Sequence, residues 1–344
     1  MDKLSKDQIQ LKKANGIIDD QMPEFARRFF ADKKHSLKAS SYYAYALELK
    51  EFFDYLGSSF NKENMKISDL DKITPEVIED FVEYLRCATV NGKPKVSSNM
   101  TLKRKLCALS SFFDYYFQKG FIGYNPLLKV NRPAVSQIPS PGSDMNDNLK
   151  LLDFVSQGNL PSEEMIKYQN KLRSRDTAIL SLIMGAGVKT SECVELNIQD
   201  LDLEHNCITI RSRREPSRIS ISSYIADVLS KYLVERLEII TFYGHDDALF
   251  LSLQKKRLGV RSIELLLKKY SSILFGDDHS IKATDMRNAF RTNVFTTSRN
   301  LFITSEMTGN TATTLLRTYT PFLECFEAEK GKDFDPSNLQ GGPK

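Results

Sequence analysis

One stretch divides this chain before any fold is considered. Residues 134–147, AVSQIPSPGSDMND, are rich in Pro, Ser and Gly and poor in apolar side chains, which is typical of a linker between domains. The chain has 344 residues, so the segment on each side of this linker is long enough to bury its own hydrophobic core. The sequence therefore predicts two domains that can move relative to one another.

The first domain is expected over residues 22–133, after a polar leader at residues 1–21. Apolar side chains recur at helical spacing through the whole region. Pro75 stands at the first position of one expected helix, and Ser97 or Ser98 can cap a longer helix that is rich in Lys and Arg near its start. The pattern predicts an all-helical domain.

The second domain is expected over residues 148–325, followed by a polar tail at 326–344 that is expected to be disordered. Most of this domain has helical periodicity. Residues 207–211 and 218–221 alternate Ile with polar residues, which predicts two strands. The fold class is thus mainly α with a small antiparallel β-sheet.

Composition excludes several classes of protein. No run of 18 apolar residues exists, so no membrane span or membrane partner is expected. The polar N-terminus lacks the apolar core of a signal peptide. The 5 cysteines form no C-x-x-C motif and no cluster with histidine, so we expect reduced thiols, no metal site and a cytoplasmic protein.

The net charge is only +4, but its distribution is uneven. Residues 93–133 contain eight Lys or Arg and one acidic residue, and residues 255–269 contain six and one. Basic stretches of this kind favour a polyanion partner such as nucleic acid, although a solvated helix face has the same composition.

A set of polar residues at fixed spacing lies near the C-terminus. Arg287 is followed after 23 residues by Asn310 and after nine more by Tyr319. This spacing resembles the tyrosine recombinases, the phage integrases and Xer-type proteins, which carry His-x-x-Arg on a helix, a Leu-Gly-His turn, and a Tyr nine residues beyond the second His. Here the first His position is Thr284 and the second is Asn310.

The resemblance extends over most of the chain, from about residue 22 to residue 322. Residues 186–192, AGVKTSE, are similar to the family's Thr-Gly-Leu-Arg-Ile-Ser-Glu. The expected hairpin with its loop SRREPS matches the family's hairpin, which carries a catalytic Lys. Residues 22–133 look like the SAM-like core-binding domain of that family. The resemblance implies a two-domain, C-shaped clamp on duplex DNA.

The resemblance also implies a chemistry. Tyr319 would be the nucleophile that forms a 3′-phosphotyrosyl bond with DNA, and Arg287 would clamp the phosphate. Because that bond keeps the energy of the phosphodiester, the reaction needs no cofactor, neither a metal ion nor ATP. Two arginines usually hold the phosphate, since a planar guanidinium donates two parallel hydrogen bonds.

Several positions depart from the family pattern. Lys189 replaces the other arginine and loses the bidentate fork. Arg213 aligns best with the hairpin lysine, with Arg214 and Arg211 as alternatives, and arginine is a poor proton donor.

Two histidine positions are also changed. Thr284 has no proton to exchange near neutral pH, whereas Asn310 still donates a hydrogen bond. His279 could replace the first histidine only if its loop folded back.

Two functions therefore remain open, and an RNA-related helical protein is a third alternative with less support. One is a working site-specific recombinase or integrase. The other is a catalytically impaired relative that binds DNA as an accessory or regulatory factor. Both imply duplex DNA as partner and a homo- or hetero-oligomer on the DNA. The candidate DNA-binding residues are Lys103, Arg104, Lys105, Arg214 and Arg218.

Overall fold

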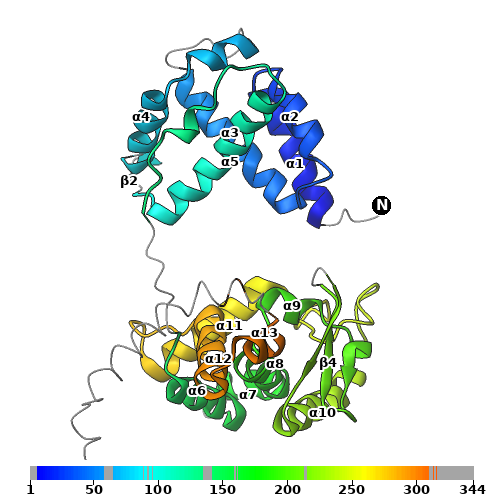
Figure 1. The fold of residues 1–344 in the computed structure, drawn as a ribbon. Helices are drawn as coiled ribbons and strands as arrows, with labels where there is room; N and C mark the ends of the chain where they lie inside the picture. Colours follow the sequence, from blue (N-terminus) through cyan, green and yellow to red (C-terminus); the bar gives the residue numbers. More distant parts are fainter. Residues whose placement is uncertain are drawn as a thin grey trace, which may run out of the picture. The chain divides into compact units, whose positions relative to one another are not determined.

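The chain folds into two compact units, Met1–Ser136 and Gln137–Lys344, each with its own hydrophobic core (Figure 1). The prediction of a mainly helical protein with a small antiparallel sheet is confirmed. None of the helices in the described ranges has the length and hydropathy of a membrane span. This computed structural model describes residues 6–57, 65–87, 89–90, 93–94, 96–134, 142–158, 160, 162–212, 215–309, 313 and 315.

The first unit is built from five α-helices, two short 3₁₀ helices and a two-residue β-hairpin within the described residues. These elements are α1 (Lys6–Gln21), α2 (Ala26–Lys33), α3 (Ala39–Leu56), η2 (Ile67–Lys72), α4 (Pro75–Arg86), β1 (Thr89–Val90), β2 (Lys93–Pro94), α5 (Asn99–Gln118) and η3 (Pro126–Leu128).

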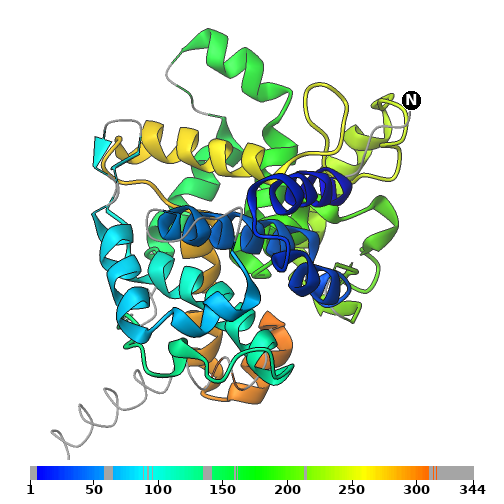
Figure 2. The same ribbon diagram turned by 90° about the horizontal axis from the view of Figure 1, so that it is seen from above.

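Helix α1 occupies the segment that was expected to be a polar leader. It packs mainly against α3, and Ala14 and Ile18, four residues apart, are fully or almost fully buried (Figures 1 and 2). The helix is therefore part of the first unit's core and does not precede it. The apolar face of α1 is narrow. Because most of its other residues are Lys, Gln or Asp, the composition of the segment alone does not reveal that face.

Helix α5 contributes buried aromatic side chains to the core of the first unit. Ser98 caps it by accepting a hydrogen bond from the Thr101 amide at 3.3 Å. Its aromatic side chains Phe112, Phe113 and Tyr116 are completely buried, and the Tyr116 hydroxyl donates to the Phe25 carbonyl at 2.5 Å. The basic residues near the start of α5 thus project from a rigid helix.

The second unit contains eight α-helices, one 3₁₀ helix and a three-stranded antiparallel sheet within the described residues. These elements are α6 (Met145–Gln157), α7 (Glu163–Asn170), α8 (Arg173–Gly185), α9 (Thr190–Glu195), η4 (Ile198–Asp200), β3 (Leu201–Asp202), β4 (Cys207–Ile210), β5 (Ser217–Ser220), α10 (Ser223–Leu237), α11 (Val260–Phe275), α12 (Ala283–Ser298) and α13 (Leu301–Thr308).

Helix α8 is the central element of this unit, and α6, α9, α10 and α12 pack against it. Strands β4 and β5 fall where the Ile alternation predicts them, with Ile208 opposite Ile219. A third strand, β3, pairs with β4 and was not predicted, because two residues are too short to show a period. Helix α6 begins at Met145, so the second unit's first helix starts inside the expected linker, capped by Asp144.

A buried charged network fixes the start of α8. Asp176 is 2% exposed, and its Oδ1 accepts hydrogen bonds from Arg175 Nε at 2.9 Å and Nη2 at 2.7 Å. Its Oδ2 accepts from the Tyr270 hydroxyl of α11 at 2.8 Å. Burial raises the pKa of Asp176, while Arg175 and then Tyr270 oppose that shift. The network ties α11 to the central helix.

Replacing Tyr270 by Phe should destabilise the second unit. The change leaves Asp176 Oδ2 without its buried donor, which costs about 1–3 kcal/mol and lowers the melting temperature by several degrees. Calorimetry of the full-length chain measures the shift. Tyr243→Phe is the matched control, since Tyr243 is 94% exposed and should melt like the wild type. Equal melting temperatures for both variants would contradict this role of the network.

Candidate functional site

Arg287 lies on α12 and reaches the bend between α8 and α9. Its Nε donates a hydrogen bond to the Gly187 carbonyl oxygen at 2.6 Å, across 100 residues of sequence. Its Nη2 is buried and has no hydrogen-bond partner among the described residues. A buried charged donor without an acceptor is costly, and it is tolerated where a ligand supplies the acceptor.

The bend that receives Arg287 requires glycine. Gly187 has a φ of +62°, a left-handed conformation that side chains disfavour. A Cβ atom at this position would lie 2.6 Å from Cδ1 of Phe290, which stands one turn after Arg287 on α12. The absence of a side chain lets α12 approach closely and keeps the carbonyl within reach of the guanidinium.

Lys189 follows this bend at the N-cap of α9. Its amide donates to Glu192 Oε2 at 2.9 Å, and its Nζ lies 3.3 Å from Glu192 Oε1. The Glu192 side chain is 5% exposed, whereas that of Lys189 is 49% exposed. The structure thus brings Lys189 and Arg287 to the same bend, although they are far apart in the sequence.

The hairpin contributes further cations, each paired with a carboxylate. Arg211 forms an ion pair through its Nε with the buried Asp200, and Arg218 on β5 pairs with Asp202. Strand pairing ends where Ile210 meets Ser217, so the basic loop begins directly after β4. Arg213 and Arg214 lie outside the described residues.

The remaining predicted positions divide between described and undescribed parts of the chain. Thr284 is exposed on the first turn of α12, three residues before Arg287. His279 lies 3.5 Å from Asp147 of α6 and packs its ring against Phe275, so its ring is engaged there. Asn310 and Tyr319 lie outside the described residues.

The DNA-binding candidates of the first unit stand on the first two turns of α5. Arg104 forms an ion pair with Glu48 of α3, and Lys105 forms one with Glu51. Lys105 is only 8% exposed, whereas Lys103 is half-buried and Arg104 is exposed. Lys103 and Arg104 are therefore better placed than Lys105 to meet a ligand.

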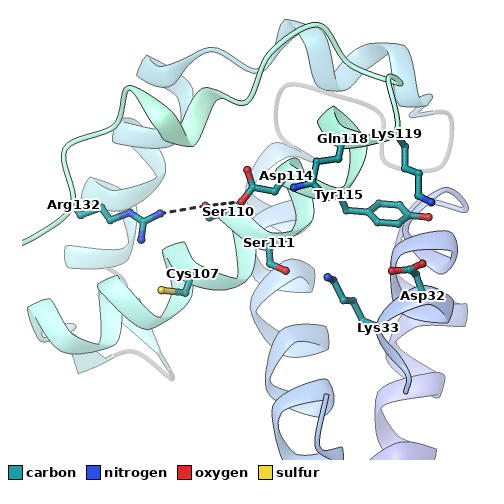
Figure 3. Close-up of a pocket in the computed structure, with 10 residues that line it drawn as sticks. All are labelled: Asp32, Lys33, Cys107, Ser110, Ser111, Asp114, Tyr115, Gln118, Lys119 and Arg132. Carbon is teal, nitrogen blue, oxygen red and sulfur yellow. Dashed lines mark hydrogen bonds between the residues drawn. The ribbon is translucent and has the colours of Figure 1, made fainter. Parts of the chain in front are cut away.

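A polar pocket of about 500 Å³ lies further along α5 (Figure 3). Figure 3 shows Arg132 and Lys33 extending into it from opposite sides. Arg132 Nη2 donates to Ser110 Oγ at 3.2 Å, and that hydroxyl lies 3.5 Å from Asp114 Oδ2. Because cations and carboxylates alternate around this pocket, it selects no single class of ligand.

Three participants were missed by reasoning from the sequence: the Gly187 carbonyl, Glu192 and Asp200. Glu192 follows Lys189 by three residues and Asp200 follows Asn197 by three, which is the spacing of a side chain that accepts from the residue before a helix. That signal was available for both acids. The Gly187 contact has no signal in the sequence, because it depends on how α12 packs.

Two family models match the chain. The model described as the phage integrase family matches residues 161–322, and the phage integrase SAM-like domain matches residues 21–131. Among curated proteins, tyrosine recombinase XerC of Thermodesulfovibrio yellowstonii is 28% identical over 293 residues, covering 84% of this chain and 86% of its own. Tyrosine recombinase XerS of Streptococcus agalactiae is 24% identical over 335 residues, covering 88% and 93%.

Solved structures share the fold. The XerH site-specific recombinase bound to palindromic difH substrate, in its post-cleavage complex, has a TM-score of 0.64 at 18% identity and covers 95% of each chain. The Tn1549 transposon integrase in complex with transposon right end DNA has a TM-score of 0.62 at 16% identity, covering 84% of this chain and 92% of its own.

Gly187→Ala should disturb the Arg287 contact and destabilise the second unit. Gly244→Ala is the matched control, because Gly244 has a φ of +79° and a Cβ atom there would have no neighbour within 4 Å. The control carries only the backbone strain, about 1–2 kcal/mol. Gly187→Ala adds the overlap with Phe290, roughly 1–3 kcal/mol more. Denaturant unfolding of the two variants measures the difference, and equal losses would contradict the close approach.

Proposed function

Because this chain belongs to the phage integrase family of tyrosine recombinases, we propose that it is a site-specific DNA recombinase or integrase that cuts and rejoins duplex DNA. The observation that carries the proposal is the bend at Gly187, which lies inside the matched region. It gathers the Arg287 guanidinium and Lys189 at one place, and Arg287 Nη2 is left without an acceptor among the described residues. Such a pair of cations suits a phosphodiester.

The proposed reaction is a pair of transesterifications. The Tyr319 hydroxyl attacks the phosphorus of a DNA phosphodiester, and the bond to the 5′ oxygen breaks. The tyrosine loses its proton, the 5′ oxygen gains one, and the DNA end stays on the protein as a 3′-phosphotyrosine. The 5′-hydroxyl of another strand reverses the step and reseals DNA, so no metal ion, ATP or cofactor is required.

The residues divide into those that hold charge and those that move protons. Arg287, Lys189 and Arg213 would stabilise the negative charge on the phosphoryl oxygens. Thr284 cannot act as an acid or base, and an arginine at the hairpin is a poor donor to the leaving oxygen. Since losing one general acid or base costs about 10²–10⁴-fold in rate, we expect slow cleavage with strong DNA binding.

DNA would be held by both units. The two solved neighbours named above are bound to DNA, and we propose that the two units, Met1–Ser136 and Gln137–Lys344, close around a duplex as a C-shaped clamp. Lys103, Arg104, Arg214 and Arg218 are proposed to contact phosphates, with a lesser role for the buried Lys105. We expect dimers or tetramers on paired sites, acting in the cytoplasm.

One alternative has a specific observation in its favour. Lys189 is paired with the buried Glu192, and Thr284 stands where the family has a histidine. The first feature weakens the stabilisation of phosphate charge, and the second removes a group that could transfer a proton, while the basic residues of both units remain for DNA binding. A catalytically impaired relative that serves as a DNA-binding accessory or regulatory factor is therefore the second candidate, and the same experiment separates the two.

Covalent capture tests the proposal and identifies the target. Tagged protein is expressed in its source cells, denatured, and only DNA that survives denaturation is sequenced. We expect enrichment at discrete sites, and Tyr319→Phe should abolish it because the ring then lacks the attacking oxygen. Discrete sites recovered only by gentle cross-linking would instead favour the accessory role. Recovery of no specific DNA by either treatment would reject both.

Restoring family residues should accelerate cleavage of the captured duplex. Lys189→Arg adds a second charge-assisted hydrogen bond to the phosphate, worth about 1.5–3 kcal/mol, so we expect at least a tenfold gain in rate. Thr284→His supplies a general base and should gain roughly 10–10²-fold. Covalent complex formed over time on a nicked duplex measures both. Lys189→Gln is the control, and its rate should fall.

A further inference from the structure

Arg257 is a half-buried cation of the second unit that neither the predicted site nor the proposed reaction uses. Its Nη1 donates to the carbonyl oxygens of Val194 and Leu196, each at 3.0 Å. Its Nη2 donates to Asn197 Oδ1 at 2.5 Å. Burial lowers the pKa of Arg257, and nearby carboxylates, Glu195 first, oppose that shift. One guanidinium thus holds three acceptors at the end of α9.

The backbone that carries Arg257 is itself fixed. The Ser252 amide donates to the Lys256 carbonyl at 2.7 Å, and the Lys255 amide donates back to Ser252 at 2.8 Å. Leu251 forms a β-bridge with Arg257, and the next amide, Leu258, donates to the fully buried Phe250 at 2.8 Å. The guanidinium is therefore presented from a closed turn rather than from a loose loop.

Helix α9 needs such support. It has 6 residues, and a helix that short is not stable alone. Its final carbonyls lack partners within the helix, and Arg257 supplies donors to two carbonyls at this end. Lys189 stands at the opposite end of the same short helix, so a displacement of its C-terminal end moves Lys189 as well.

The same contacts continue into the sheet. The Asn197 amide donates to Asp200 Oδ2 at 2.9 Å, and Asp200 Oδ1 accepts from Arg211 Nε. Arg211 follows β4 directly and leads into the basic hairpin loop. Arg257, Asn197, Asp200 and Arg211 thus form a continuous series of hydrogen bonds from the end of α9 to the base of that loop.

From this geometry we infer that Arg257 is a positioning residue, which sets where Lys189 and Arg211 stand relative to one another. It acts through Val194, Leu196 and Asn197 and does not touch the DNA. The inference rests on the proposed function for its catalytic consequence, but the ordering of α9 does not depend on any reaction. A misplacement of about 1 Å in a site of this kind can slow chemistry by roughly 10²-fold.

The test compares three variants of the full-length chain. Arg257→Met keeps a long apolar stem and loses all three hydrogen bonds, whereas Arg257→Lys keeps the charge and one or two donors. Arg236→Lys is the matched control. Arg236 is 3% exposed and its Nε and Nη2 donate to the carbonyls of Ala248 and Asp246 at 2.8 and 2.7 Å, and within the described residues it forms no hydrogen bond with α9.

Two readouts are used. In amide hydrogen exchange without DNA, Arg257→Met should speed exchange at residues 193–198 at least tenfold, Arg257→Lys less, and Arg236→Lys least. On the captured duplex, Arg257→Met should slow covalent-complex formation at least tenfold while DNA affinity changes less than threefold, and Arg257→Lys should recover part of the rate.

The outcomes separate the two proposals. Unchanged exchange at residues 193–198 in Arg257→Met, or equal loosening in Arg236→Lys, overturns the positioning role. Faster exchange with an unchanged rate of covalent-complex formation also overturns it. If the wild-type chain forms no covalent complex, the proposed recombinase activity fails, and hydrogen exchange alone decides whether Arg257 orders α9.

Discussion

The second unit depends on one close approach, that of α12 to the bend after α8. Arg287 donates to the Gly187 carbonyl at 2.6 Å, and the bend tolerates this only because residue 187 has no side chain to meet Phe290. The contact joins segments 100 residues apart, two residues before Lys189 at the start of α9. A shift of α12 would move Arg287 away from this bend, since no other hydrogen bond of Arg287 in the described ranges reaches it.

Arg287 also differs from its neighbours in the charge of its partner. Lys189, Arg211 and Arg218 each pair with a carboxylate, Glu192, Asp200 or Asp202 respectively. Those cations must give up or share an anion before they can meet a phosphate. Arg287 is held by a neutral carbonyl, so its full charge remains for a ligand. Among the described cations of this site, it is therefore the one that forms no ion pair with a carboxylate of the described residues.

Much of the fold could be predicted from the sequence, because most helices are long and their apolar residues recur clearly at helical spacing. Pro75 is the first residue of α4 and Ser98 caps α5, as expected, and both strands of the hairpin lie within one residue of their expected bounds. The strand β3 was missed because two residues are too short to show a period, and the polar segment that forms α1 was placed outside the first domain because its apolar signal is weak. The sequence identified Arg287 and Lys189 as candidate site residues from their motifs. It did not predict that Arg287 reaches the bend at Gly187 beside Lys189, because that contact depends on how α12 packs.

The lysine at position 189 makes the support of α9 matter more than an arginine would. A guanidinium fork fixes its own orientation on a phosphate through two parallel bonds, whereas an ammonium on a flexible stem is oriented only by what surrounds it. Here the surroundings are Glu192 and the short helix itself, whose far end is held by Arg257. The position of the Lys189 ammonium therefore depends on the position of the α9 backbone. For this reason the hydrogen bonds at the C-terminal end of α9 affect how Lys189, at its N-terminal end, meets a phosphate.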